Sequence, residues 1–440
     1  MAEREEQIDY EFISKTSKKS LSTLSMLKGN MLIILICRCI WQFSTAIPRP
    51  YLSLYVLALG GDAGTVGQVY ALSSIAGIFF YPVGGYIADH QGRVKLVGAA
   101  TYLYAASFLL FVFAWDWTIL AFASFLQNLV LFYVPALYAL TADSVPKERS
   151  GTGFALLLAI PGALGIVGPY IGGYLISIYG LTFALRVCYV IGFIAGIIVA
   201  TLRTFTLKET LFTTSQTASF KQFPRLIKES YESFWTTLKW MPQSLRSLAI
   251  MQIAKVSLVY ISGPFWVLYA TEVLGITPFE WGQIALISGA IRFAVAIPAG
   301  KFIDKYGAKK ILVGLLTLTP ILSIAFLYSN SFVQALTVLS FIEIFNAFTI
   351  PAFQSMMTGL IPKEKRGRVL AALGIGNFYV DTRGVAIGHG ALLFAPGMLA
   401  FILGGILYEV NATYPFIFMT FGSVVNAIIA LKLLPSEKES

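Results

Sequence analysis

Apolar runs long enough to cross a lipid bilayer recur along most of this 440-residue chain, separated by short polar stretches. A membrane-spanning helix needs ~20 largely apolar residues. The pattern predicts helical spans near 31–57, 65–88, 95–115, 117–142, 152–178, 182–204, 247–273, 279–303, 309–328, 331–358, 368–408 and 414–434. We therefore expect an all-α membrane protein with 12 transmembrane helices.

The longest polar stretch divides these spans into two groups of six. This predicts a cytoplasmic N-terminal tail, a first six-helix bundle, a central cytoplasmic loop, a second six-helix bundle and a short cytoplasmic tail, over 1–29, 30–204, 205–246, 247–434 and 435–440. In the central loop, apolar residues from Phe220 to Leu238 recur at helical spacing among basic ones. That spacing predicts an amphipathic helix on the inner membrane surface, with the docking of a partner as the alternative.

Charge placement predicts the orientation of the spans. Only 12% of the residues are charged, although the net charge is +10, whereas a soluble domain carries about 25% charged residues. Lys and Arg gather in loops on one side, such as those at Arg93 and Arg149, whereas loops on the other side carry Asp62, Asp116 or Glu409. The positive-inside rule then places both termini in the cytoplasm. We expect a multi-pass plasma-membrane protein, a monomer, with the bilayer and not nucleic acid as its partner.

The chain offers little for enzyme or cofactor chemistry. Its three cysteines lie in apolar runs, and two histidines are too few for a histidine metal site. It has no Walker-type phosphate-binding motif and no nucleophile–base pair at helix ends or in loops. We expect no cofactor, no metal and no enzymatic activity. Residues 1–28 are polar and begin acidic, so the first apolar run is expected to be retained as a membrane anchor.

The two halves repeat each other at an offset of roughly 215 residues. Gly67 and Gln68 match Gly282 and Gln283, and the segment 146–151 matches 362–367. Because each repeat has an even number of spans, the two halves are related by an axis along the membrane normal. This symmetry predicts two pseudo-symmetric bundles that rock about a site between them, which is alternating access.

A loop signature occurs once in each half. The chain reads Gly85-Tyr-Ile-Ala-Asp89-His-Gln-Gly92-Arg93 and, in the second copy, Gly300-Lys-Phe-Ile-Asp304-Lys-Tyr-Gly307. These loops resemble the signature loops of the major facilitator superfamily. The resemblance of the chain to that family covers about residues 30–434. The resemblance implies that fold and a cytoplasmic gate, whose aspartate latches onto the eleventh helix while its arginine pairs with an acid ending the fourth. The gate residues it implies are Gly85, Asp89, Gly92, Arg93, Asp143, Gly300, Asp304 and Gly307.

The two gates are expected to differ in strength, because Gly359 stands where Asp143 stands in the first half. Simple anchoring of the loops at the membrane surface is the alternative role for these charges. In the fifth span, Gly168-Pro169-Tyr-Ile-Gly172-Gly173 resembles the core of a motif associated with drug–proton antiporters. This favours export, although the arginine that those antiporters carry in the fourth span is missing around Gln127.

Polar groups at membrane depth are costly and usually functional, which makes them the best candidates for substrate or coupling contacts. The candidates are Arg38, Trp41, Gln42, Gln127, Gln252, Lys255, Arg292, Glu343 and Asn346. Glu343 is a candidate for binding and releasing a proton, while Arg38, Lys255 and Arg292 could hold an anionic substrate or restrain Glu343.

Alternatives stay open for several of these residues. Trp41, Tyr260 and Trp266 offer surface for an apolar solute. Against these functional roles stand a structural Arg292–Glu343 ion pair and an Arg38 side chain that extends to the lipid headgroups. The eleventh segment is longer than its counterpart, with the excess around 374–390. It predicts either a broken helix beside the site or a helix lengthened into the cytoplasm.

Taken together, these patterns predict a secondary active transporter of a small organic solute, working by alternating access with proton-coupled efflux. An uptake symporter for an organic anion or nutrient is one alternative, and a non-transporting membrane sensor of transporter ancestry is another.

Overall fold

The computed structural model describes residues 26–90, 92–146, 149–210, 239–361 and 391–433, with isolated positions between them and without the side chains of 79–90, 358–360, 391 and 433. In the first half the α-helices are α2 Asn30–Ala46, α3 Leu52–Ala58, α4 Ala63–His90, α5 Arg93–Val112, α6 Trp117–Val130, α7 Val134–Ser144, α8 Ser150–Gly165, α9 Gly168–Tyr179 and α10 Leu181–Thr206. In the second half they are α12 Gln243–Ser262, α13 Trp266–Glu272, α14 Pro278–Tyr306, α15 Ala308–Leu327, α16 Phe332–Leu360, α18 Ala391–Val410 and α19 Tyr414–Leu433.

Eleven helical segments in this described part are long and apolar enough to cross a membrane. Ten of them overlap expected spans closely, and the eleventh expected segment, 368–408, is described as a span only over Leu392–Val410. The second expected span, 65–88, lies within the 28-residue helix α4. The all-helical membrane fold is thereby confirmed, while the count of twelve spans stays a prediction. The predicted amphipathic helix of the central loop and the excess around 374–390 fall outside the described residues.

Proline and glycine interrupt several spans near their centres, because proline removes a backbone donor from the helix. In the first and seventh spans the break is a 3₁₀ turn with a proline, η1 Arg49–Tyr51 and η5 Gly263–Phe265. The fourth span breaks at η2 Leu131–Tyr133, and the fifth breaks between α8 and α9. The breaks therefore recur at matching places in the first and seventh spans.

The internal repeat is visible as a matched hydrogen bond in each half. The hydroxyl of Tyr55 donates to the carbonyl of Phe111 at 2.9 Å, and the hydroxyl of Tyr269 donates to the carbonyl of Leu327 at 3.1 Å. Each bond ties the last part of a bundle's first span to the end of its third. Two homologous segments have therefore folded in the same way.

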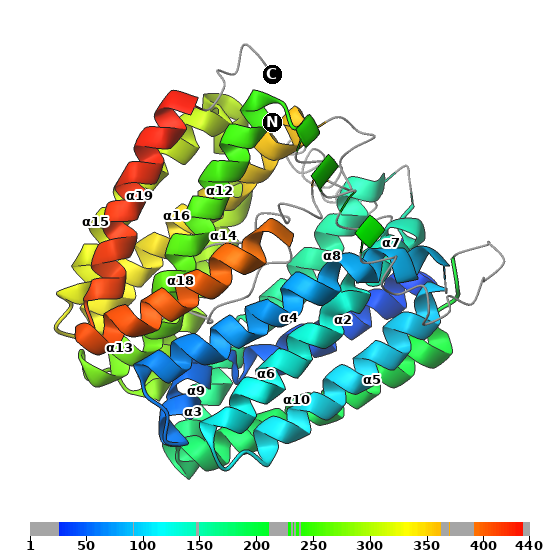
Figure 1. Cartoon of the computed structure of the whole chain (residues 1–440), viewed down its shortest axis with the longest axis horizontal. Coiled ribbons are helices and arrows are strands. Elements are labelled where there is room, and N and C mark those ends of the chain that lie inside the picture. The colour runs from blue at the N-terminus through cyan, green and yellow to red at the C-terminus, as the bar shows by residue number, and fades with distance from the viewer. Residues whose placement is uncertain are drawn as a thin grey trace, which may run out of the picture.

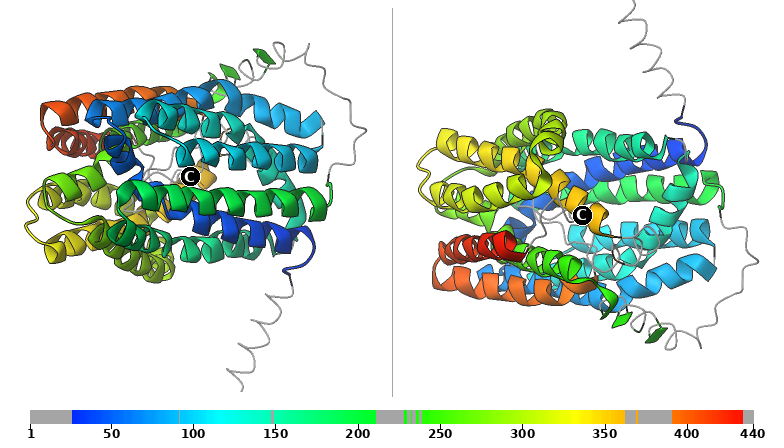
Figure 2. Two further views of the ribbon diagram at one scale, coloured as in Figure 1. Left: turned by 90° about the horizontal axis from the view of Figure 1, so that it is seen from below. Right: turned by 90° about the horizontal axis from the view of Figure 1, so that it is seen from above.

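In the described part the halves meet at one end of the bundles and, along α4 and α18, as far as Phe394, which packs in a cluster of the first half. We call the end that carries Asp62 and Glu409 the outer end, and the end that carries Arg93 and Asp143 the inner end. Helix α4 packs along α18 and α9 packs along α14, which joins the halves. From this contact the two bundles diverge toward α7 and the start of α12 (Figures 1 and 2).

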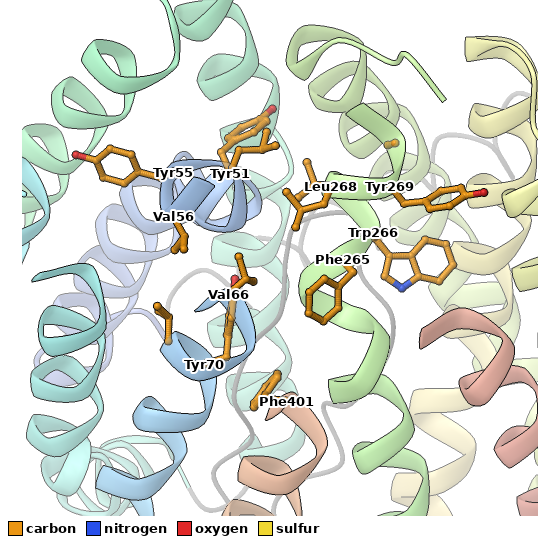
Figure 3. Close-up of a cluster of buried hydrophobic side chains, with 14 of the residues drawn as sticks. Tyr51, Tyr55, Val56, Val66, Tyr70, Phe265, Trp266, Leu268, Tyr269 and Phe401 are labelled. Atoms are coloured by element: carbon orange, nitrogen blue, oxygen red, sulfur yellow. The ribbon is translucent and has the colours of Figure 1, made fainter. Parts of the chain in front are cut away.

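Buried apolar clusters show the same asymmetry. At the outer end a single cluster draws residues from both halves, including Tyr51, Tyr70, Phe265 and Phe401 (Figure 3). Toward the inner end each half has a cluster of its own, one around Met31 and Leu157 and the other from Leu245 to Ala430. The structure is therefore closed between the halves at the outer end, and its inner ends pack separately.

Candidate functional site

Two of the predicted polar residues of the second half meet between α14 and α16. The Nη1 atom of Arg292 lies 3.2 Å from Oε2 of Glu343, whose side chain is 1% exposed. Asn346 lies one turn along α16 and is also buried. The ion pair, which the sequence left as an alternative, is what the structure contains. The distance between the two side chains does not test whether Glu343 binds and releases protons, so this role stays a prediction.

Lys255 and Gln252 project from neighbouring positions of α12. Gln252 is buried and Lys255 is half-buried. Among the residues with described side chains, Lys255 has no salt bridge, in contrast to Arg292. Among the described residues of α12 and α14, Arg292 is thus paired with a carboxylate and Lys255 is a cation without a salt bridge.

The predicted polar residues of α2, Arg38 and Gln42, contact helix α8 of their own half. The Nη1 atom of Arg38 donates to the carbonyl of Leu157 on α8 at 3.3 Å. One turn later Gln42 lies against Gly165, where an added Cβ would come within 3.0 Å of its side chain. The Arg38 guanidinium is thus bound to α8 in this structure.

Trp41 belongs to an aromatic cluster shared by three spans. Its ring meets Tyr104 on α5 edge-on, with centroids 4.8 Å apart, and lies 6.3 Å from Phe108. The Tyr104 hydroxyl lies 3.5 Å from Oε1 of Gln127 on α6. Trp41 and Gln127, two separate predictions, are therefore neighbours through Tyr104.

A buried cation that the sequence reading missed lies beside this cluster. Arg203 on α10 is 3% exposed, and its Nη1 donates to the hydroxyl of Thr101 at 2.8 Å. Its guanidinium carbon lies 5.9 Å from the centroid of Trp41 and 5.7 Å from that of Tyr133. It was missed because basic residues in the last turn of a span normally belong to the inner surface charge. It brings a guanidinium to the fourth span, which has no arginine of its own near Gln127.

Two aromatic candidates are packing residues. Tyr260 is 1% exposed and stacks on Phe401 at 4.4 Å, and Trp266 is 3% exposed between Phe326 and Phe416. Helix packing covers both rings in this structure, so a solute contact for either ring stays a prediction for another arrangement of the halves.

The predicted gate of the first half is partly formed. Arg93 at the start of α5 makes an ion pair with Asp143 at the end of α7, as the resemblance implied. Gly92 precedes it with φ 84°, a conformation that favours glycine. The side chain of Asp89 lies outside the described part, as does residue 85 beyond its place in helix α4.

A third acid joins this gate. The carboxylate of Glu209, just beyond α10, accepts a hydrogen bond from the backbone amide of Val94 at 2.9 Å. It therefore satisfies a free amide at the start of α5, where a negative charge is also favoured by the helix dipole. Sequence reading missed it because its partner is a backbone group far along the chain.

The corresponding residues of the second half differ. Gly300 and Asp304 lie in α14, and Gly307 has φ 90° like Gly92. Asp304 is exposed and makes no salt bridge to a residue that the structure describes. The inequality of the two gates stays a prediction, because the side chain of Asp89, the counterpart of Asp304, lies outside the described part.

The antiporter-like motif lies where the halves touch. An added Cβ on Gly172 would lie 2.5 Å from the carbonyl of Ile47 in its own half, and one on Gly173 would lie 2.5 Å from the carbonyl of Pro278 in the other. Gly168 and Pro169 begin the same helix, α9. The motif therefore allows α9 to pack against both halves at once.

Comparisons with known proteins agree with this architecture. The Major Facilitator Superfamily profile matches residues 34–379 and 248–440, and the chain belongs to this family. It is 30% identical to the multidrug resistance protein MdtG of Dickeya zeae, over 74% of this chain and 78% of that one. It is 26% identical to a multi-drug resistance efflux pump, a PmrA homolog of Lactococcus lactis, over 74% and 79% of the two chains.

Among solved structures, a transporter of the POT family in complex with 5-aminolevulinic acid aligns with a TM-score of 0.69 at 15% identity. The alignment covers 92% of this chain and 95% of that one, and at this identity it speaks for the fold. The protein is accordingly a multi-pass membrane transporter. No group of three or more potential metal ligands occurs among its described residues.

Proposed function

We propose that this transporter exports small organic molecules across the plasma membrane by alternating access, driven by protons moving inward. The observation that carries the proposal is the buried Arg292–Glu343 pair between two spans of the second half. The names of the relatives, multidrug resistance protein and efflux pump, support the outward direction.

The ion pair supplies a physical link between a proton and helix position. A buried pair is tolerable while both charges are present, and losing one partner costs roughly 3–5 kcal/mol because the other charge is left buried. Protonation of Glu343 would remove its charge and weaken its attraction for Arg292. The helices α14 and α16 would then favour a different arrangement, or Arg292 would attract an anionic substrate.

Substrate contacts would come from both halves. Trp41 and Gln127 contribute an aromatic ring and an amide from the first half, and Lys255 and Asn346 contribute an ammonium and an amide from the second. Trp41, Gln127 and Lys255 all remain partly exposed. This set suits an amphipathic organic molecule with at least one polar group.

Flux in proteoliposomes with an imposed pH gradient tests the coupling. We expect the gradient to drive substrate movement in the wild-type protein, and Glu343→Gln to abolish the response to pH while substrate still moves down its own gradient. Glu232→Gln, which removes an exposed carboxylate outside the spans, is the matched control. Unchanged pH-driven flux in Glu343→Gln would remove Glu343 as the coupling group, and flux indifferent to pH in the wild type would remove proton coupling.

A second candidate, transport of organic anions, is favoured by the surplus of cations at depth. Arg38, Arg203 and Lys255 make no salt bridge within the described residues. The same vesicles can compare anionic and cationic amphipaths of similar size, with Lys255→Gln as the variant. A preference for anions that Lys255→Gln reduces would support this class, and a preference for cations would exclude it. Inward accumulation would indicate an uptake symporter, and ligand binding without flux would indicate a sensor.

A further inference from the structure

We propose that Tyr51 and Glu409 are the outer latches of this transporter: two side chains that bridge the halves when the outer end is closed, and so determine how readily it opens. Neither residue belongs to the gate implied by the family resemblance, which lies at the inner end. The two latches lie at different contacts between the halves.

Tyr51 connects the halves through its hydroxyl. The side chain is fully buried in η1, and its oxygen lies 2.6 Å from the carbonyl of Pro169 and 3.1 Å from the carbonyl of Pro278. Pro169 belongs to α9 in the first half, whereas Pro278 is the first residue of α14 in the second. One hydroxyl has a single proton to donate, so it is shared between a carbonyl of each half.

The surrounding glycines bring these carbonyls within reach. An added Cβ on Gly282 would lie 2.7 Å from the Pro169 carbonyl, just as one on Gly173 would meet Pro278. Tyr170 and Phe279 flank the contact with ring centroids 5.5 Å apart. Separation of α9 from α14 would therefore leave the Tyr51 hydroxyl with its partner in the first half and remove the one in the second.

Glu409 connects the halves through a carboxylate at a helix start. It lies in the last turn of α18 in the second half, and its Oε1 accepts a hydrogen bond from the backbone amide of Gly64 in the first turn of α4 at 3.0 Å. The first amides of a helix have no partner within it and favour a negative charge. Gly64 has no room for a side chain there, because an added Cβ would collide with the Glu409 carboxylate.

Asp62, which belongs to the first half like α4 itself, caps the same helix start. Its Oδ1 accepts the backbone amide of Thr65 at 2.8 Å and the Thr65 hydroxyl at 2.5 Å. These bonds hold the pKa of Asp62 below its usual value, so it stays charged next to Glu409. The start of α4 is thus shared by one carboxylate from each half, and only that of Glu409 depends on closure.

The equivalent positions of the two halves do not carry the same bridge. The start of α14 corresponds to the start of α4, yet it is capped within its own half, by Thr277 and Glu280. Phe265 stands where Tyr51 stands in the other half and has no hydroxyl to bridge with. Each of the two equivalent contacts therefore has one polar bridge, of a different kind.

Spin labels on the outer ends measure the effect directly. Cysteines would replace Trp115 and Tyr328, which are 78% and 76% exposed in opposite halves, in a protein whose Cys37, Cys39 and Cys188 are alanine. Pulsed electron paramagnetic resonance then gives the distance distribution without substrate. We expect Tyr51→Phe and Glu409→Ala each to raise the population with separated outer ends about fivefold, as for one lost hydrogen bond.

The control substitutions remove a hydroxyl and a carboxylate whose hydrogen bonds lie within one half. Tyr55→Phe removes a hydroxyl one turn away whose bond lies within the first half, and Glu280→Ala removes a helix-start carboxylate within the second. Gly64→Ala tests the Glu409 latch independently by displacing its carboxylate. The proposal is overturned by unchanged distances in Tyr51→Phe and Glu409→Ala, or by equal shifts in the controls. Because no substrate is present, this outcome does not depend on the proposed export.

Discussion

At the scale of single residues, Arg203 and Arg292 differ in how their charge is accommodated within the helix bundle. Arg292 has a carboxylate partner, whereas Arg203 has a hydroxyl and two aromatic faces. Cation–π contacts with desolvated rings contribute roughly 2 kcal/mol or more, which offsets part of the cost of burying the charge. Arg203 therefore ties α10 to the rings of Trp41 and Tyr133 and to Thr101 on α5.

Substitution of Arg203 tests this arrangement. In a double-mutant cycle with Arg203→Met and Thr101→Val, we expect a coupling free energy of unfolding of about 2 kcal/mol, as for a hydrogen bond to a charged group. Arg203→Lys should be less stable than the wild type, as Arg203→Met is, because an ammonium cannot lie flat against two rings. Denaturant unfolding in detergent gives the values.

The control uses a hydroxyl on the same helix. Thr204 lies next to Arg203 and bonds to the carbonyl of Ala200 in its own helix, so Thr204→Val should show no coupling to Arg203→Met. Coupling as large with Thr204 as with Thr101 would contradict the assigned contact.

At the scale of elements, the broken fifth span determines how closely the halves approach. The break between α8 and α9 places Gly172 and Gly173 where the backbone of each half passes. The second half repeats the arrangement with Gly404 and Gly405, which pack against the carbonyls of Ile261 and Ala63. Sequence motifs identified the glycines of the fifth span, but only packing shows that each glycine of the pair faces a different half.

A methyl group at Gly173 should prevent the outer end from closing fully. The added carbon would lie 2.5 Å from a backbone carbonyl, which cannot move aside as a flexible side chain can. Overpacking of this kind costs about 1–3 kcal/mol, so we expect transport by Gly173→Ala to fall roughly tenfold. Flux in proteoliposomes measures the loss.

Gly162→Ala is the matched control in the same span. An added Cβ there meets nothing within 4 Å, so transport should stay within about twofold of the wild type. Equal losses in both variants would show that helix flexibility and not close approach explains the effect of Gly173→Ala.

At the scale of the whole molecule, closure at one end follows from an unequal distribution of contacts. The outer cluster includes residues of both halves, while the inner clusters are confined to one half each. Within the first half, Arg93, Asp143 and Glu209 tie α5, α7 and the end of α10 together at the inner end. A half that is held together in this way can move as a unit, which alternating access requires.

The predicted orientation can be checked on intact cells. A membrane-impermeant thiol reagent should label a cysteine at Trp115, on the outer end, in intact cells. A cysteine at Lys305, exposed on the inner end, should react only after the cells are permeabilised. Both belong to a protein whose native cysteines are alanine. Labelling of position 305 in intact cells would reverse the assigned orientation and, with it, the proposed direction of export.

Sequence alone predicted most of the fold and part of the site. The spans followed from apolar runs, the repeat from matched residues, and the Arg93–Asp143 pair from resemblance to a family. Arg292 and Glu343 were both candidates because of their depth, and their contact was one of two open readings. Arg203 and Glu209 were missed, since basic and acidic residues near the end of a span look like ordinary surface charge.

The sequence by itself determined what depends on local composition, namely the positions of the apolar spans and the likeness of the two halves. It also predicts their orientation. The hydropathy of a segment depends only on its own residues, so a span can be predicted without knowing which helices pack against it. Contacts such as Glu409 with Gly64, 345 residues apart, depend on how the helices pack. Their energies arise from distance and direction between segments, which only the tertiary structure decides. The outer latches belong to that second kind, because each takes one partner from each half.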